Sequence, residues 1–80
     1  MTTVHVQYYA ILREQARASR ETVTTRAQTA AALYAELTAR HGFTLAESLM
    51  KVAINGEFAP WTSVLNDGDE IVYIPPVAGG

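Results

Sequence analysis

The chain contains 80 residues, of which 49% are hydrophobic and 18% are charged, and this composition predicts one folded domain with a small core. It has no cysteine, which excludes disulfide bonds and thiolate metal sites. The net charge is −2 and the basic residues are scattered along the chain, which argues against a nucleic-acid-binding surface. No apolar run reaches the roughly 18 residues of a membrane span, and the N-terminal stretch MTTVHVQYYA lacks the pattern of a secretory signal, so we expect a cytoplasmic protein with no membrane partner.

The first part of the chain predicts two strands with a short helix between them. Residues 3–9 (TVHVQYY) alternate apolar and more polar side chains, and a period of two with β-branched and aromatic residues is typical of a half-buried strand. Residues 10–18 continue as a short helix, and residues 21–25 (ETVTT) have the composition of a second strand. The side chains of the first strand that we expect to face the core are Val4, Val6 and Tyr8.

The clearest helix lies within residues 28–43. Thr29 can cap its first turn, and Leu33 and Leu37 lie on one face. Basic residues occupy its last turn, where positive charge suits the helix dipole, and Gly42 stands where a helix commonly ends. The pattern therefore predicts one long amphipathic helix.

The second half predicts two more strands separated by turns. Residues 51–55 (KVAIN) form a short apolar strand that ends at an Asn-Gly turn. Residues 57–65 are expected to be irregular, because Pro60 cannot join a central ladder. Residues 66–70 (NDGDE) predict another turn, and residues 70–74 (EIVYI) predict a strand that is apolar on both faces.

This order of elements predicts an α+β fold in which one long helix packs on one face of a mixed sheet. If the first and last strands lie side by side in the centre, the result is a β-grasp sheet of the ubiquitin type. We expect residues 1–76 to form this domain and residues 77–80 to form a flexible C-terminal tail, because termini without an apolar pattern are usually disordered.

Side chains suited to catalysis are scarce. The imidazoles are His5 and His41, the single lysine is Lys51, and no local motif supports a nucleophile with its base, so we expect no active site within this chain. The acids of the 66–70 turn lack the spacing of a calcium loop, and a tight turn with solvated acids is the better interpretation, so we expect no bound metal. These acids are Asp67, Asp69 and Glu70.

The chain ends in Gly79 and Gly80 after a stalk that contains Pro75 and Pro76. Proline fixes φ and favours an extended stalk, and glycine lets the backbone pass close to an enzyme and a nucleotide. We interpret the tail as a handle for an enzyme that activates the Gly80 carboxylate. An amine that attacked the activated carboxyl group would make the chain a covalent modifier, whereas a persulfide would leave a thiocarboxylate.

Two stretches of the sequence carry a resemblance to a known family. Residues 66–80 (NDGDEIVYIPPVAGG), preceded by VAING, resemble the ending of molybdopterin synthase small subunits, and VQYYAILRE resembles the start of the same family. The two-proline stalk before the diglycine favours this family over the related thiamine sulfur carriers. Residues 17–50 carry no motif of the family.

The resemblance implies a sulfur-carrier mechanism. An E1-like adenylyltransferase would use ATP and magnesium to adenylate Gly80, and a sulfurtransferase would supply sulfur for a thiocarboxylate. The tail would then enter a pocket of the large synthase subunit and donate sulfur to the cyclic pyranopterin precursor of the molybdenum cofactor. Because each pterin needs two sulfurs, family members act as a heterotetramer of two small and two large subunits. The small subunit is a co-substrate that binds no cofactor, and the catalytic side chains belong to the large subunit.

Three alternatives remain open at the level of sequence. The chain is a sulfur carrier for another pathway (thiamine thiazole, cysteine or tRNA thiolation), a ubiquitin-like modifier joined to lysines, or an interaction module in which the diglycine has no role.

The last strand also suggests where a partner docks. An open sheet covered by one helix normally shows water a polar face, yet Val72 and Ile74 would lie on that face. Together with Tyr9 and Phe58 they would form one exposed patch at the root of the tail, and such patches mark protein interfaces. The alternative is that these residues are ordinary core or scattered surface residues. The full set of expected partner-binding residues is Tyr9, Phe58, Val72, Ile74, Pro75, Pro76, Val77 and Ala78.

Overall fold

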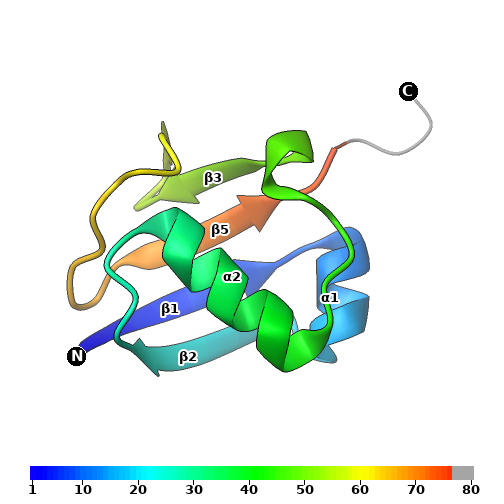
Figure 1. Cartoon of the computed structure of the whole chain (residues 1–80), viewed down its shortest axis with the longest axis horizontal. Helices are drawn as coiled ribbons and strands as arrows, with labels where there is room; N and C mark the ends of the chain where they lie inside the picture. The colour runs from blue at the N-terminus through cyan, green and yellow to red at the C-terminus, as the bar shows by residue number, and fades with distance from the viewer. Residues whose placement is uncertain (77–80) are drawn as a thin grey trace.

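The computed structural model describes residues 1–76, which fold into a five-stranded sheet and two α-helices (Figure 1). The expectations for Val77, Ala78, Gly79 and Gly80, including a flexible tail, concern residues outside this range. The elements in chain order are β1 (Thr2–Tyr8), α1 (Ala10–Ala16), β2 (Arg20–Thr25), α2 (Ala30–His41), the 3₁₀ helix η1 (Glu47–Leu49), β3 (Lys51–Ile54), β4 (Glu57–Ala59) and β5 (Glu70–Ile74).

The sheet is mixed, with the strand order β2-β1-β5-β3-β4. The first and last strands are parallel neighbours in the middle of the sheet, in a register that pairs Val6 with Ile71 and Tyr8 with Tyr73. All the other neighbouring strands are antiparallel. The condition stated for a β-grasp sheet, that the first and last strands lie side by side in the centre, is therefore met.

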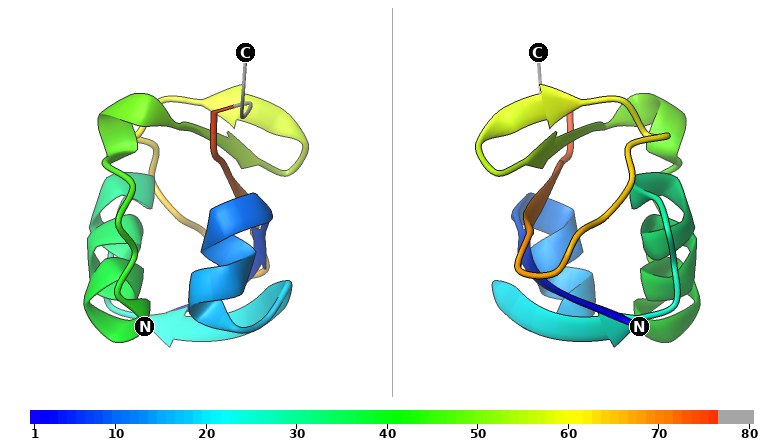
Figure 2. Two further views of the ribbon diagram at one scale, coloured as in Figure 1. Left: turned by 90° about the vertical axis from the view of Figure 1, so that its right-hand side faces the viewer. Right: turned by 90° about the vertical axis from the view of Figure 1, so that its left-hand side faces the viewer.

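Helix α2 covers one face of the curved sheet, and α1 lies at the end of the sheet where β1 and β5 finish (Figures 1 and 2). The ends of α2 follow the sequence signals. The Thr29 hydroxyl accepts a hydrogen bond from the Ala32 N–H (3.1 Å), which satisfies one of the amides at the start of the helix. At the other end Gly42 adopts φ 74° and its N–H donates to the Thr38 carbonyl (2.8 Å).

The core lies between α2 and the inner face of the sheet. The two central strands contribute the side chains that alternation predicted, and α2 contributes Leu33 and Leu37, both with 0% exposure. The buried Tyr73 hydroxyl donates to the Ala30 carbonyl (2.9 Å), so the phenol is satisfied as well as buried. Truncating a fully buried leucine such as Leu33 to alanine would cost about 2–5 kcal/mol of stability. The buried residues of the central strands are Val4, Val6, Tyr8, Ile71 and Tyr73.

Residues 57–59 correct the expectation of irregular structure. They form β4, which pairs with β3 at the edge of the sheet. The connecting Asn55 and Gly56 both have positive φ (53° and 85°), which is the backbone of a tight hairpin turn and aligns the two strands. Pro60 ends the strand after three residues, so its effect is to shorten β4 rather than to prevent it.

Candidate functional site

The sheet has a second face, opposite α2, which we call the outer face. The strand registers place Phe58, Ala53, Val72 and Gln7 in one row across it, from the edge strand β4 to the central strand β1. Phe58 is 72% exposed and Val72 is partly exposed. Phe58 and Val72 therefore flank the buried Ala53, and β4 and β5 contribute exposed apolar side chains to one stretch of the outer face.

The apolar row continues to the end of β5. Ile74 is partly exposed and alternates with the fully buried Tyr73, so it lies on the outer face with Val72. Its Cα partner on β3 is Lys51, which is exposed. Pro75 and Pro76 follow at once, and the chain leaves the sheet beside these side chains.

Tyr9 was expected on the outer face as a continuation of the first strand. The structure instead places it at the N-cap of α1, after β1 has ended, with 44% of its surface exposed. Its hydroxyl accepts a hydrogen bond from the Gln7 side-chain amide (2.9 Å), and Gln7 pairs with Val72 in the register of β1 and β5. Tyr9 therefore remains linked to the apolar row through Gln7, although it is no longer part of the strand.

The part of the outer face over β1 and β2 is polar, and its groups bind one another. Arg20 donates to both carboxylate oxygens of Glu70 (2.8 and 3.1 Å), and His5 shares a hydrogen bond with Thr22 (3.1 Å). The outer face is thus divided into an apolar half over β3, β4 and β5 and a polar half over β1 and β2. A docking protein would pay a smaller desolvation cost to bury the apolar half than to bury the polar half.

The acids near β5 have structural partners. Asp69 is only 7% exposed, and its carboxylate accepts hydrogen bonds from the Asn55 side chain (2.9 Å) and the Asn66 N–H (2.8 Å). Asp67 accepts from the Thr3 N–H (2.8 Å). The turn was expected, but a solvated Asp69 was wrong, because this carboxylate ties the turn to the hairpin. Within residues 1–76 no group of three or more His, Asp or Glu side chains is placed to hold a metal ion.

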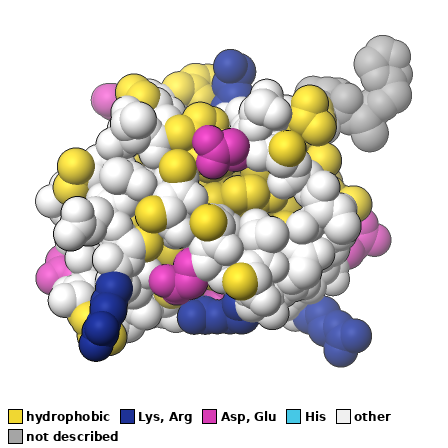
Figure 3. Space-filling view, viewed as in Figure 1, with side chains coloured by type: hydrophobic (Ala, Val, Ile, Leu, Met, Phe, Trp, Pro, Cys, Tyr) yellow, Lys and Arg dark blue, Asp and Glu magenta, His cyan; other side chains and the backbone are white. Residues whose placement is uncertain are grey.

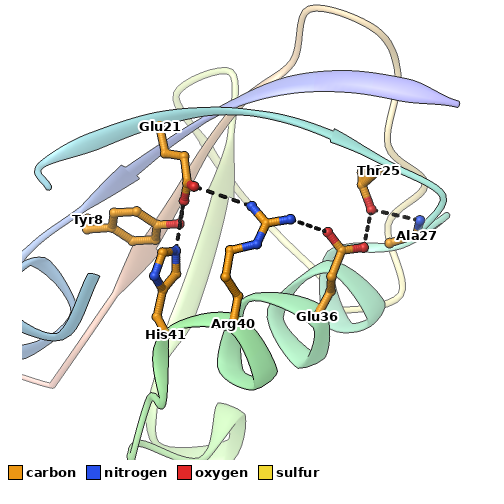
Figure 4. Close-up of polar contacts among 7 residues, drawn as sticks. All are labelled: Tyr8, Glu21, Thr25, Ala27, Glu36, Arg40 and His41. Atoms are coloured by element: carbon orange, nitrogen blue, oxygen red, sulfur yellow. Dashed lines mark hydrogen bonds and ion pairs between the residues drawn. The ribbon is translucent and has the colours of Figure 1, made fainter. Parts of the chain in front are cut away.

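A polar cluster that the sequence did not reveal joins α2 to the first two strands (Figure 4). The Tyr8 hydroxyl donates to Glu21 Oε1 (2.6 Å), His41 Nε2 lies 2.9 Å from the same oxygen, and Arg40 pairs with Glu21 Oε2 (3.3 Å). Arg40 also reaches Glu36, which accepts from the Thr25 hydroxyl. The available signal was a glutamate two residues before the buried Val23, a spacing that puts both side chains on the inner face of β2.

The electrostatics of this cluster favour an ionised Glu21. Partial burial acts to raise the pKa of Glu21, but hydrogen bonds from Tyr8 and His41 and the charge of Arg40 outweigh it and hold the pKa below its ordinary value of 4.5. Burial and the bond to Glu21 raise the pKa of Tyr8. The cluster lies on the helix side of the sheet and fastens α2 to β1 and β2 (Figure 4).

Two broader features bear on possible partners. On the side of the molecule that carries α2, the Lys and Arg side chains lie apart from one another (Figure 3). Among the described helices, none combines the length and apolar character that crossing a membrane requires.

Part of the chain is similar to a curated protein. Over 31 residues the chain is 52% identical to the molybdopterin synthase sulfur carrier subunit of Mycobacterium tuberculosis. The matched segment spans 39% of this chain and 37% of that relative.

Solved structures extend the likeness to the whole fold. A Pyrococcus furiosus protein provisionally assigned as subunit 1 of molybdopterin converting factor is 26% identical, with a TM-score of 0.78 over 96% of this chain and 100% of its own. A chain in the complex of subunits 1 and 2 of the molybdopterin-converting factor of Helicobacter pylori is 24% identical (TM-score 0.67, covering 99% and 100%). Caldiarchaeum subterraneum ubiquitin is 16% identical (TM-score 0.63, covering 99% and 98%), which supports a ubiquitin-like β-grasp fold.

A family model matches nearly the entire sequence. The model describes the ThiS family, and it covers residues 6–80, from the middle of β1 to the terminal glycine. The chain therefore belongs to the ThiS family.

Proposed function

We propose that this ThiS-family sulfur carrier is the small subunit of a molybdopterin synthase. The observation that carries the sulfur-carrier part of the proposal is the family match, which runs through residue 80 and so spans the diglycine end. The 52% identity to a molybdopterin synthase sulfur carrier subunit supports the choice of pathway within the family.

The chemistry begins at the C-terminal carboxylate. An E1-like adenylyltransferase, using ATP and magnesium, joins a Gly80 carboxylate oxygen to the α-phosphate of ATP and releases pyrophosphate. A persulfide sulfur of a sulfurtransferase then attacks the carbonyl carbon and displaces AMP, which gives an acyl disulfide. A thiol attacks the donor's sulfur of this disulfide, so the two thiol sulfurs join in a new disulfide and the thiocarboxylate leaves. In this proposal the chain is a co-substrate of these steps, and the catalytic side chains belong to its partners.

The thiocarboxylate then donates its sulfur to the cyclic pyranopterin precursor in the pocket of the large subunit. Two small subunits, each carrying a thiocarboxylate, supply the two sulfurs of each pterin in a heterotetramer of two small and two large subunits. The apolar half of the outer face suits this docking, because it borders Pro75 and would aim the tail at the partner.

Intact-mass analysis tests the first part of the proposal. The purified chain is incubated with the E1-like adenylyltransferase, ATP, magnesium and a sulfurtransferase with its sulfur source. We expect a mass increase equal to the exchange of one oxygen for sulfur, and no increase when ATP is omitted. Appearance of the chain in isopeptide linkage to other proteins, with no thiocarboxylate, would favour a protein modifier instead.

A further inference from the structure

A pocket lies at the edge of the sheet beside the apolar half of the outer face. It has a volume of about 250 Å³ and forms where β3 begins and β4 ends. Phe58 belongs both to this pocket and to the apolar row of the outer face, so the two surfaces are continuous. The residues that line the pocket are Met50, Lys51, Val52, Phe58, Ala59, Pro60 and Trp61.

Lys51 gives this apolar surface a single positive charge. It is the only lysine in the chain, it is exposed, and its Cα partner Ile74 is the last residue before the two prolines. The acids of the neighbouring strands lie elsewhere. Glu70 on the same face of β5 is held by Arg20, and Glu57 pairs with Ile54 at the opposite end of the hairpin. Within residues 1–76, the ion pairs involve Arg20, Arg40 and His41, and none involves Lys51.

This placement constrains any partner that covers the root of the tail. Burial of Phe58 and Ile74 against a partner would also remove Lys51 from water, and a buried ammonium without an acceptor is strongly destabilising. A partner with an apolar surface alone, or with its own cation opposite Lys51, would be rejected by this cost. A charge at this position therefore selects among partners as well as attracting one.

We propose that Lys51 and the adjoining pocket form a specificity site, which binds an apolar side chain next to a carboxylate on the partner protein. The apolar side chain fills the pocket against Phe58 and Trp61, and the carboxylate binds the Lys51 ammonium at the rim. The inference rests on the proposed function, in which that partner is the large synthase subunit. It adds the chemistry by which the carrier distinguishes that partner from other proteins with apolar surfaces.

Charge variants test the site by isothermal titration calorimetry with the purified large subunit. We expect Lys51→Glu to weaken binding by at least about tenfold, because it sets like charges against each other. Lys51→Met should weaken binding and make the affinity less dependent on salt. Lys51→Arg, which keeps the positive charge, should have the affinity and the salt dependence of the wild type. Arg26→Glu is the matched control. Arg26 is exposed beyond the end of β2, and its replacement changes the net charge by the same amount as Lys51→Glu, but away from the site.

The pocket has its own probe, because Trp61 is the only tryptophan in the chain. In a ¹⁵N-labelled chain the single indole N–H resonance should shift when the unlabelled large subunit binds. Equal affinities of wild-type chain and Lys51→Glu, or an unmoved indole resonance in the complex, would overturn the inference. If these results accompany normal sulfur transfer, the proposed function stands. If the wild-type chain neither binds the large subunit nor transfers sulfur, both fail.

Discussion

The hydroxyl of Tyr8 donates a 2.6 Å hydrogen bond to the carboxylate of Glu21 and thereby joins the central strand β1 to its neighbour β2. A bond to an ionised acceptor is shorter and stronger than one between neutral groups. The same carboxylate also meets His41 and Arg40 of α2. The contacts of Glu21 with His41 and Arg40 therefore hold the helix layer on the sheet layer.

Replacing Tyr8 by phenylalanine should lower the free energy of unfolding by about 1–3 kcal/mol, because Glu21 loses a charge-assisted bond in a partly buried place. Urea unfolding followed by circular dichroism measures the change. Tyr9→Phe is the matched control, since within residues 1–76 the Tyr9 hydroxyl bonds only to Gln7, on the exposed side, and its loss should cost less than about 0.5 kcal/mol. Equal losses in the two variants would contradict the role given to Glu21.

Acid should weaken the fold through Glu21. Because the pKa of Glu21 is lowered in the folded state, its carboxylate stabilises the protein above the ordinary pKa of 4.5, and this contribution is lost as the pH falls below that value. Glu21→Gln should therefore be less stable than the wild type near neutral pH, and the difference should shrink below about pH 4. A gap that stays constant across a urea-unfolding series at decreasing pH would refute this linkage.

Removal of Gly80 should abolish sulfur transfer and leave the fold intact. The core of the described part of the chain is built from residues 4–73, and the last strand ends at Ile74, before the tail. Addition of one residue after Gly80 should have the same effect, because the activating enzyme would then meet a different carboxylate. Intact-mass analysis measures the thiocarboxylate, and thermal unfolding measures the stability of the fold. Synthase activity that persists in the truncated chain would contradict the prediction.

Charges introduced into the apolar half of the outer face should weaken docking. Phe58→Asp and Ile74→Asp should each reduce affinity for the large subunit by roughly tenfold or more, with a native-like circular dichroism spectrum. Val64→Asp is the control, because Val64 is also apolar and 66% exposed but bridges to Thr29 near the start of α2. If all three variants bind like the wild type, the large subunit docks on another surface. If Phe58→Asp and Ile74→Asp both unfold, the assignment of the docking surface to the apolar half also fails.

Much of the fold followed from local signals that tertiary packing did not override. The alternation in residues 3–9 and the capping signals at Thr29 and Gly42 specify the core strand and the long helix with little ambiguity. The edge strand β4 could not be predicted in the same way, because three residues next to a proline carry too short a pattern. Its existence depends on the Asn55-Gly56 turn and on pairing with β3.

In the candidate site, too, some features follow from the local sequence and others depend on how the strands pack. The apolar side chains of β5 revealed that its outer face was unusual, and the exposure of Phe58 agrees with that interpretation. The position of Lys51 beside Ile74 depends on the register of β3 and β5, which no local pattern encodes. The Glu21 cluster likewise joins residues that are far apart in the sequence, so only the packed structure brings them together.

Transfer of a labelled sulfur atom tests the central claim most directly. The chain is charged with ³⁵S at its C-terminus by the adenylyltransferase and sulfurtransferase, purified, and mixed with the large subunit and the cyclic pyranopterin precursor. We predict that the label leaves the carrier and appears in the dithiolene of the pterin product, and that omission of the large subunit prevents the transfer. Label that stays on a carrier bound to the large subunit, or that passes only to a thiazole, cysteine or tRNA acceptor, would contradict the proposal.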